Sequence, residues 1–439
     1  MEKRLITIAL SSLLVLTGCG GGGGDKAQDK DSGLQSPNKD GDPALEQLQA
    51  YRADSLQAPA ALNCVTLYKQ QQSCKVSDIA PLGYGNNQDL TVEDIAARLV
   101  VSHGWMGDNF VAALREMPQD LLNLFRSVNA IVLSFEIRPS FYHSGTASMY
   151  IDPRYLWLSE TQWQDIYQQD DYRDAYQSQF QFVAANRYLD PYGQYVLTSN
   201  TYDREVNAYR DTGKITRGLY RLLAHELAHA NDYLPQDTLA DLDTSLTIFQ
   251  NIQKRFPVNS DLNRDYPLSS VMLHDLAQAS FRGETPTQAQ TQLDAATLGA
   301  EFEFDGAADY YAYSSQAEDV AMLFEAYMMH QQYLAVSDVA FLVEPTVATP
   351  YCDDYKIGWG QRDRLADSYV KARAKQISER ILMRDLTAEF SDIEGSAKPL
   401  PYGVGWCDAQ SRFVSGKPMV KSQQDVQQTR FFRDDFSRD

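Results

Sequence analysis

Two histidines and a glutamate stand at the spacing of a zinc-binding helix. The run His225-Glu226-Leu227-Ala228-His229 has the form H-E-x-x-H. Residues four apart lie on one face of a helix, so both imidazole rings can bind one metal ion while Glu226 reaches a water molecule in the same site. A Lewis acid beside a general base is the chemistry that hydrolyses peptide bonds. We therefore predict a catalytic zinc site with His225 and His229 as ligands and Glu226 as the general base.

The surrounding residues predict the helix that must carry this motif. Leu219, Leu223, Leu227 and Ala230 recur at helical spacing and form an apolar stripe beside the row that holds the histidines. Such a helix is half buried. The alternative is an ordinary amphipathic helix whose two histidines are hydrogen-bonded in the core. The spacing and the helical context together favour the metal site.

A catalytic zinc site needs a third protein ligand and leaves a fourth position for water. The segment 310–330 predicts a second helix that begins at Ser315, with Glu318 one turn inside it. We predict Glu318 as the third ligand. The competing interpretation is a capping box, in which Ser315 and Glu318 satisfy backbone N–H groups and the carboxylate is held locally.

Other residues are weaker candidates for the third ligand. Asp232 shares a helix face with both histidines, but no glycine between Gly218 and Gly283 lets the chain turn back toward the metal there. The remaining alternatives, each more simply explained as a surface or locally bonded residue, are His274, Glu301 and Glu303.

The two segments resemble the gluzincin-like zinc peptidases typified by the catalytic domain of anthrax lethal factor. In that family the HExxH helix continues into an acidic and aromatic stretch, as residues 229–233 (HANDY) do here, and a later helix carries the ligand Glu as E-x-x-A, as residues 318–321 (EDVA) do. The resemblance implies a zincin-like core and Zn²⁺ as cofactor. It also implies Tyr311, seven residues before Glu318, as the donor that stabilises the oxyanion, with Tyr310 and Tyr313 as nearby alternatives.

The sequence departs from this family in two places. About ninety residues separate His229 from Glu318, more than the family has, which predicts an inserted helical subdomain. Met322 stands where the family has a second acidic residue, so Glu325 is expected to support the site instead. Asp232 and Asp319 are candidates to orient a ligand histidine through its other nitrogen, with a solvated helix charge as the alternative for each.

The fold class that we predict is α+β and mainly helical. Residues 44–124 have helical periodicity, 130–137 (AIVLSFEI) predict a strand, and 148–158 predict a weaker strand interrupted by Pro153. In zincin folds the last strand before the zinc helix pairs with an extended substrate, and either strand here could do so. The predicted units are a helical N-terminal region (46–128), a zincin-like metallopeptidase domain (129–345) and a C-terminal extension (346–439), in which we find no second catalytic motif.

The N-terminus predicts export and lipid anchoring. A basic start is followed by the apolar stretch 5–16 and by Leu16-Thr17-Gly18-Cys19, which resembles the lipobox of bacterial lipoproteins. We therefore predict a signal peptide at 1–18, lipidation of Cys19 and a flexible tether at 19–45. Because Gly20 follows the lipidated residue, we expect an outer-membrane lipoprotein of the bacterial cell envelope. The alternative is an uncleaved hydrophobic anchor.

Four further cysteines suit an exported chain. An even number permits two disulfides, and the candidates are Cys64, Cys74, Cys352 and Cys407. The sequence does not choose among the three possible pairings, although Cys64–Cys74 closes a short loop and Cys352–Cys407 staples the C-terminal segment. Buried thiols are the alternative.

Composition narrows the class of partner. With 439 residues, 44% of them hydrophobic, the chain can bury a full core. A formal net charge of −20 opposes binding to nucleic acid, and no basic cluster offsets it. We predict a monomeric zinc metalloendopeptidase that acts on a peptide or protein and touches the membrane only through its lipid. The alternative is a non-catalytic, zinc-stabilised envelope lipoprotein that serves binding or assembly.

Overall fold

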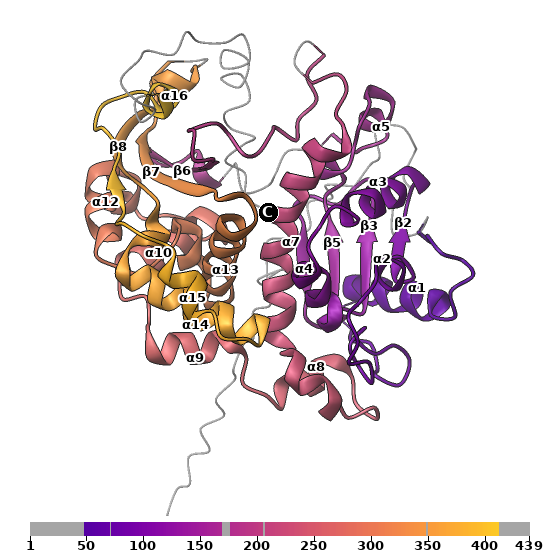
Figure 1. The fold of residues 1–439 in the computed structure, drawn as a ribbon. Helices are drawn as coiled ribbons and strands as arrows, with labels where there is room; N and C mark the ends of the chain where they lie inside the picture. The colour runs from indigo at the N-terminus through magenta and orange to yellow at the C-terminus, as the bar shows by residue number, and fades with distance from the viewer. Residues whose placement is uncertain (1–47, 71, 169–175, 205–206, 348–349, 412–439) are drawn as a thin grey trace, which may run out of the picture.

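The computed structural model describes residues 48–70, 72–168, 176–204, 207–347 and 350–411. Within them the chain is α+β and mainly helical, as predicted, with helices packed around two small sheets (Figure 1). The predicted signal peptide 1–18, Cys19, the tether 19–45 and the polar tail from Lys417 lie outside the described residues. None of the described helices is long and apolar enough to cross a membrane.

The first sheet is buried on both faces. Its strand order is β1-β2-β3-β5-β4, with β2, β3 and β5 parallel and both outer strands antiparallel to their neighbours. Side chains alternate between faces, so Ile131 belongs to the large core, whereas Val132 and Tyr150 belong to a smaller core against α1. The strands are β1 (Gln49–Ala50), β2 (Leu99–Val101), β3 (Ala130–Leu133), β4 (Phe141–His143) and β5 (Ser148–Ile151). The helices of this part of the chain are α1 (Ala58–Thr66), α2 (Val92–Ala96), α3 (Gly104–Leu114), α4 (Gln119–Leu124) and α5 (Glu160–Gln164).

The sequence predicted this sheet only in part. Strands β3 and β5 were expected, and β5 ends just before Pro153, but β4 was not expected and the helical prediction is wrong at Leu99–Val101. These three apolar residues form an inner parallel strand that is buried on both faces, so it lacks the alternation that marks a half-buried strand. The sheet takes strands from both sides of residue 128, and the predicted boundary between regions therefore runs through it.

The second sheet is antiparallel, in the order β6-β7-β8-β9. Its last two strands come from the predicted C-terminal extension, so the boundary at 345/346 also runs through a sheet. The strands are β6 (Phe182–Leu189), β7 (Val336–Val343), β8 (Lys356–Arg362) and β9 (Lys398–Pro399). The C-terminal helices are α14 (Ser368–Leu382), α15 (Thr387–Ser391) and α16 (Trp406–Ser411).

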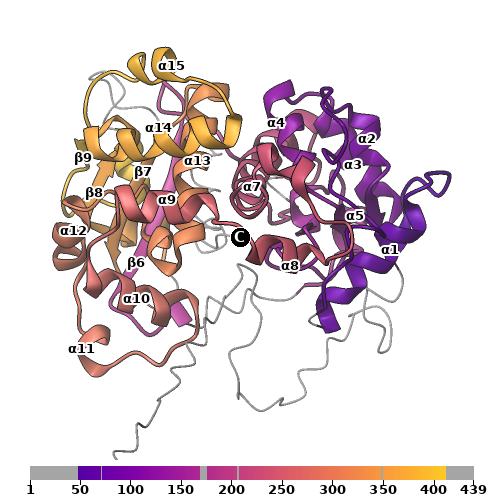
Figure 2. The same ribbon diagram turned by 90° about the horizontal axis from the view of Figure 1, so that it is seen from below.

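Two long helices lie side by side between the sheets. Helix α7 (Thr212–Tyr233) packs against the first sheet and its helices on one side and against α13 (Gln316–Tyr333) on the other (Figures 1 and 2). Asp211 and Ser315 cap their N-termini through side-chain oxygens. The two helices predicted to carry the metal ligands are thus adjacent at the centre of the molecule.

The long segment between these helices is itself largely helical, as the spacing of the motifs predicted. Its helix α9 packs against α13, and the segment returns the chain to the metal-binding region through the short 3₁₀ helix η6 (Tyr310–Ser314). Its helices are α8 (Ile248–Gln253), α9 (Val258–Asp265), α10 (Val271–Phe281), α11 (Gln288–Thr291) and α12 (Ala295–Glu303).

The structure forms two disulfides. Cys64 is bonded to Cys74 and Cys352 to Cys407, with Cα–Cα distances of 5.4 Å and 5.8 Å. The first closes a loop of the N-terminal region, and the second joins the segment before β8 to α16. Of the three pairings left open by the sequence, this one is formed.

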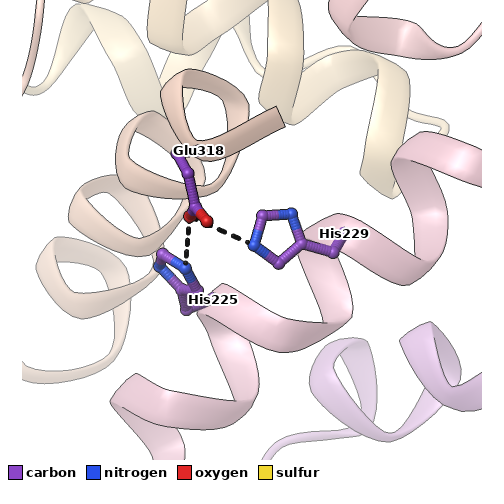
Figure 3. A group of neighbouring side chains, drawn as sticks. All are labelled: His225, His229 and Glu318. Carbon is purple, nitrogen blue, oxygen red and sulfur yellow. Dashed lines mark hydrogen bonds and ion pairs between the residues drawn. The ribbon is translucent and has the colours of Figure 1, made fainter. Parts of the chain in front are cut away.

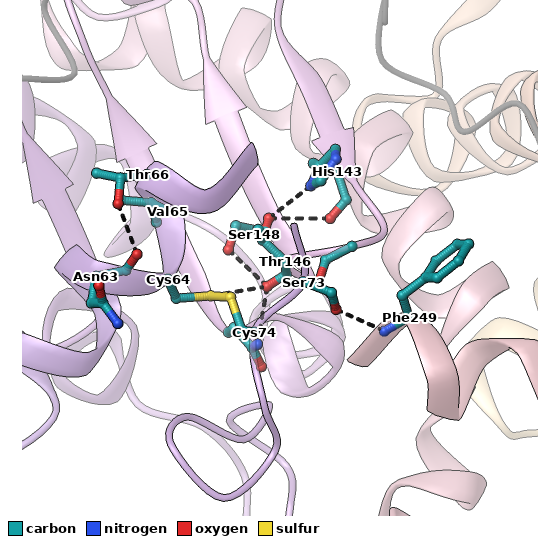
Figure 4. The surroundings of a disulfide bond; sticks show 12 residues. Asn63, Cys64, Val65, Thr66, Ser73, Cys74, His143, Thr146, Ser148 and Phe249 are labelled. Carbon is teal, nitrogen blue, oxygen red and sulfur yellow. Dashed lines mark hydrogen bonds between the residues drawn. A yellow bond between two sulfur atoms is a disulfide. The ribbon is translucent and has the colours of Figure 1, made fainter. Parts of the chain in front are cut away.

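The first disulfide lies beside the turn between β4 and β5 (Figure 4). Sγ of Cys64 is 3.6 Å from the carbonyl oxygen of Thr146 in that turn. The hydroxyl of Ser73 donates to the carbonyl of Gly145 (2.6 Å) and accepts the N–H of Phe249 in α8 (3.0 Å). The disulfide loop therefore connects the β4–β5 turn to the helical segment that follows α7.

A buried carboxylate joins three strands of the second sheet. Asp338 of β7 has no solvent exposure and accepts hydrogen bonds from Arg187 of β6 (2.8 Å) and from Arg362 of β8 (2.6 Å). Arg187 also donates to the carbonyl of Trp406 (2.7 Å), and its guanidinium lies 3.9 Å from the centroid of that indole ring. One carboxylate thus pairs with two cations, and Arg187 helps to hold α16 on the sheet.

We expect Asp338→Asn to destabilise the protein by about 3–5 kcal/mol, because it leaves two buried guanidinium groups without a counter-charge. Urea denaturation followed by circular dichroism would measure the change. Asp261→Asn is the matched control, since Asp261 forms an exposed ion pair with Arg264 and its loss should leave the urea midpoint almost unchanged. Equal midpoints for the two variants would contradict the prediction.

Candidate metal centre

The three residues predicted as metal ligands lie together. His225 and His229 project from α7 toward Glu318 of α13 (Figure 3). Nε2 of His225 is 3.0 Å and Nε2 of His229 is 3.3 Å from Oε2 of Glu318. All three are buried, with 5%, 2% and 3% of their surfaces exposed. One ligand atom from each lies within 4.8 Å of the others.

These donor atoms fit a zinc ion. Two imidazole nitrogens and one carboxylate oxygen are ligands that zinc prefers, at bond lengths of about 2.0–2.2 Å. Ligand atoms at those bond lengths around a tetrahedral ion are about 3.4 Å apart, close to the separations in this structure. Oε2 of Glu318 therefore lies at about this spacing from Nε2 of each histidine.

Glu318 is positioned by the start of α13. The side chain of Ser315 accepts the backbone N–H of Glu318 at 3.2 Å and caps the helix. The carboxylate of Glu318 points to the histidines. The structure thus combines the two interpretations left open by the sequence, because Ser315 caps the helix while the carboxylate of Glu318 faces the candidate centre.

Glu325 supports His225 from the other side of the ring. Its Oε2 lies 3.3 Å from Nδ1 of His225, and its carboxylate is fully buried. Tyr188 of β6 donates a hydrogen bond to Oε1 of Glu325 (2.8 Å), and Arg221 lies 3.5 Å from Oε2. A carboxylate behind a ligand histidine fixes the ring orientation and the tautomer, as expected for Glu325 from the sequence.

Asp232 and Asp319 do not orient a ligand histidine, contrary to the expectation. Asp232 accepts the backbone N–H and the side-chain amide of Asn259, both at 2.7 Å, and so ties α9 to α7. Asp319 forms a buried ion pair with Arg373 of α14. Nδ1 of His229 is buried without a hydrogen-bond partner among the described residues. Both aspartates have tertiary partners that their helix positions do not reveal.

The weaker candidates for the third ligand are bonded to other residues, which are distant in the sequence. Nδ1 of His274 lies 3.1 Å from the carbonyl oxygen of Tyr313. Glu301 accepts the hydroxyl of Ser270 (2.7 Å), and Glu303 accepts the indole N–H of Trp359 (3.2 Å). In the described part of the chain, these residues are not part of the His225–His229–Glu318 group.

The structure distinguishes Tyr311 from its two neighbours. Its hydroxyl donates to Oε1 of Glu318 at 3.0 Å, whereas the hydroxyl of Tyr310 bonds to Ser280 and that of Tyr313 to Asp305. Of the three tyrosines considered from the sequence, Tyr311 is therefore the one that reaches the candidate centre.

Burial and neighbouring opposite charges shift the pKa values of His225 and Glu318 in opposite directions. Burial disfavours the charged form of His225, but its contacts with Glu318 and Glu325 and the nearby charge of Glu226 outweigh this effect and raise its pKa to about 10. Burial would raise the pKa of Glu318, yet its interactions with His229 and His225 lower it well below the ordinary value. Glu226, whose charge also acts on His225, is buried as well, with 2% of its surface exposed. Without a metal ion, a proton on His225 therefore balances the charge of Glu318.

Two cations near the centre were not predicted from the sequence. Arg221 lies one turn before His225 on the same face of α7, so helical spacing could have revealed it. Arg282, 3.8 Å from Oε1 of Glu318, follows α10 and carries no local signal of its position. The packing of α10 against η6 brings Arg282 close to Glu318.

Comparisons with protein families, with curated proteins and with solved structures found no match to this chain. Its function is therefore inferred from the residues of the centre and from their geometry.

We expect zinc affinity to rise about tenfold per pH unit between about pH 6 and pH 8, because zinc must displace a proton from His225. The pKa of His225 is raised, so the proton stays bound through neutral pH and affinity falls as pH falls. Competition with a chelator would measure the zinc affinity at each pH. Glu325→Gln removes one carboxylate that raises this pKa, and should make the pH dependence shallower. An affinity independent of pH would contradict the prediction.

Proposed function

We propose that this protein is a zinc-dependent endopeptidase with a zincin-like core, which hydrolyses peptide bonds with Glu226 as the general base. The observation that carries the proposal is the convergence of His225, His229 and Glu318, from two separate helices, on one buried point. Glu226 lies between the two histidines in the sequence of the same helix. This is the arrangement that zinc peptidases use.

The residues of the centre can divide the work of hydrolysis. A bound zinc ion would supply Lewis acidity, lowering the pKa of a water molecule and stabilising negative charge on the substrate carbonyl oxygen. Glu226 would take a proton from the attacking water and return it to the amine of the departing product. The hydroxyl of Tyr311 would donate to the carbonyl oxygen as charge develops, an effect typically worth about 3 kcal/mol. Glu325 would hold the ring of His225 in place throughout.

The outer strand β4 is the best candidate to bind an extended peptide. It lies at the edge of the first sheet, antiparallel to β5, and so offers an edge for strand addition. The ring of Tyr142 in β4 stacks on Tyr233 of α7, with centroids 6.2 Å apart, four residues beyond His229. Neither strand predicted from the sequence has this edge position, because β3 and β5 both lie inside the sheet.

A non-catalytic, zinc-stabilised lipoprotein is the alternative function. A structural zinc site normally fills all four positions with protein ligands. Among the described residues the group contains three ligands, with a glutamate beside the first histidine. A group of three such ligands with a glutamate beside the first histidine favours catalysis over a structural role.

We further propose that the protein is a monomeric lipoprotein of the bacterial cell envelope, anchored through Cys19. The two disulfides support an oxidising compartment. A peptide or protein is the expected substrate, and the net charge of −20 argues against nucleic acid.

The deciding experiment compares metal content and cleavage of a mixed peptide library in wild type and variants. We expect one zinc ion per chain, which His225→Ala and Glu318→Ala both reduce. Glu226→Gln should keep zinc and lower cleavage by about 10²–10⁴-fold, because it removes the base and not a ligand.

Glu303→Gln is the matched control, since this glutamate is exposed and bonds to Trp359 away from the centre; it should match wild type in both measurements. Zinc without cleavage in wild type would favour the structural lipoprotein. Absence of zinc from wild type, even after addition of the ion, would refute both functions.

A further inference from the structure

The two oxygens of Glu318 have different partners. Oε2 faces Nε2 of His225 and Nε2 of His229, so it is the oxygen placed to join them as a metal ligand. Oε1 accepts the hydroxyl of Tyr311 at 3.0 Å and lies 3.8 Å from Nη2 of Arg282. The carboxylate is thus oriented by two histidines on one oxygen and by a tyrosine and an arginine on the other.

Arg282 is brought to this oxygen by the segment between the two ligand helices. It directly follows α10, whose last residue, Phe281, packs against Tyr310 and Tyr311 with centroid distances of 5.2 Å and 4.9 Å. The chain then turns at Gly283, where φ is +76° and an added Cβ would meet Tyr176 at 2.9 Å. The aromatic packing therefore fixes Arg282 and Tyr311 relative to each other.

The roles proposed for Tyr311 compete for one proton. A phenol has a single O–H, so Tyr311 cannot donate to Glu318 and to a substrate carbonyl oxygen at the same time. Arg282 has five N–H donors and keeps its charge at every accessible pH. Its side chain is 25% exposed, whereas that of Glu318 is 4% exposed. It can therefore stay on Oε1 while the tyrosine turns away.

We infer that Arg282 is a positioning residue that holds Oε1 of Glu318, so that Oε2 alone faces the metal and Tyr311 is free to donate to the substrate. This inference rests on the proposed zinc peptidase. Arg282 is an ion-pair partner of Oε1 at 3.8 Å, beyond hydrogen-bond distance. Without it, departure of Tyr311 would leave Oε1 with neither of these partners, and the carboxylate could rotate toward the position that water requires. The guanidinium thus protects both the ligand geometry and the open coordination position.

The test is a double-mutant cycle on the purified full-length protein, with Arg282→Gln, Tyr311→Phe and the double variant. The readouts are zinc affinity by chelator competition and the visible spectrum of the Co²⁺-substituted protein, which reports coordination number and geometry. We expect Arg282→Gln to weaken zinc binding about 10–100-fold. Tyr311→Phe should cost less alone, and more in the Arg282→Gln background, because each donor can compensate for the other. The Co²⁺ spectrum should change most in the double variant.

Two further variants separate this role from general destabilisation. Arg282→Lys keeps the charge and should restore part of the zinc affinity. Arg264→Gln makes the same substitution in an exposed ion pair on α9 and should match wild type. Wild-type zinc affinity and an unchanged Co²⁺ spectrum in Arg282→Gln would overturn the inference while leaving the zinc peptidase intact. Failure of the wild type itself to bind zinc would instead overturn the proposed function.

Discussion

A carboxylate buried between two helices is the constraint on which the centre of this protein depends. An ionised carboxylate that leaves water must be paired with positive charge or bound to a metal ion, because its isolated burial costs many kcal/mol. Glu318 meets this requirement with the two histidines of α7. The requirement fixes α7 against α13, and the two sheets with their helices hold that pair from opposite sides.

The buried charges around Glu318 and its histidines must be compensated in the same way. Glu318 and Glu325 both raise the pKa of His225, and the buried Glu325 is in turn contacted by Arg221 and Tyr188. The next residue along α13, Asp319, is paired with Arg373 on α14. These ion pairs, with the hydrogen bond from Tyr188, connect β6 and α14 to the two helices of the candidate metal centre. Removing any one member would leave its buried neighbour without compensation.

The sequence predicted those parts of the molecule that depend on residues close together in the chain. Helical periodicity, a capping serine and the four-residue spacing of histidines predicted α7, α13 and the meeting of His225, His229 and Glu318. Glu325 was found because it lies on the same helix face as Glu318. Arg282 could not be predicted, because the contacts that place it come from η6. The strands β2 and β4 could not be predicted either, because they are too short to show a clear alternation. Asp232 and Asp319 were misjudged for the same reason, since Asn259 and Arg373 approach them from distant segments.

The loop closed by Cys64–Cys74 touches the turn that leads from the edge strand β4 to β5, and Ser73 extends the contact to α8. That loop is constrained only after both thiols have been oxidised, which the reducing cytoplasm does not favour. A nascent or unexported chain would therefore lack the covalent restraint nearest to the strand proposed to receive substrate. Under the proposed export and peptidase function, the covalent restraint beside this edge strand would form only after the chain has left the cytoplasm.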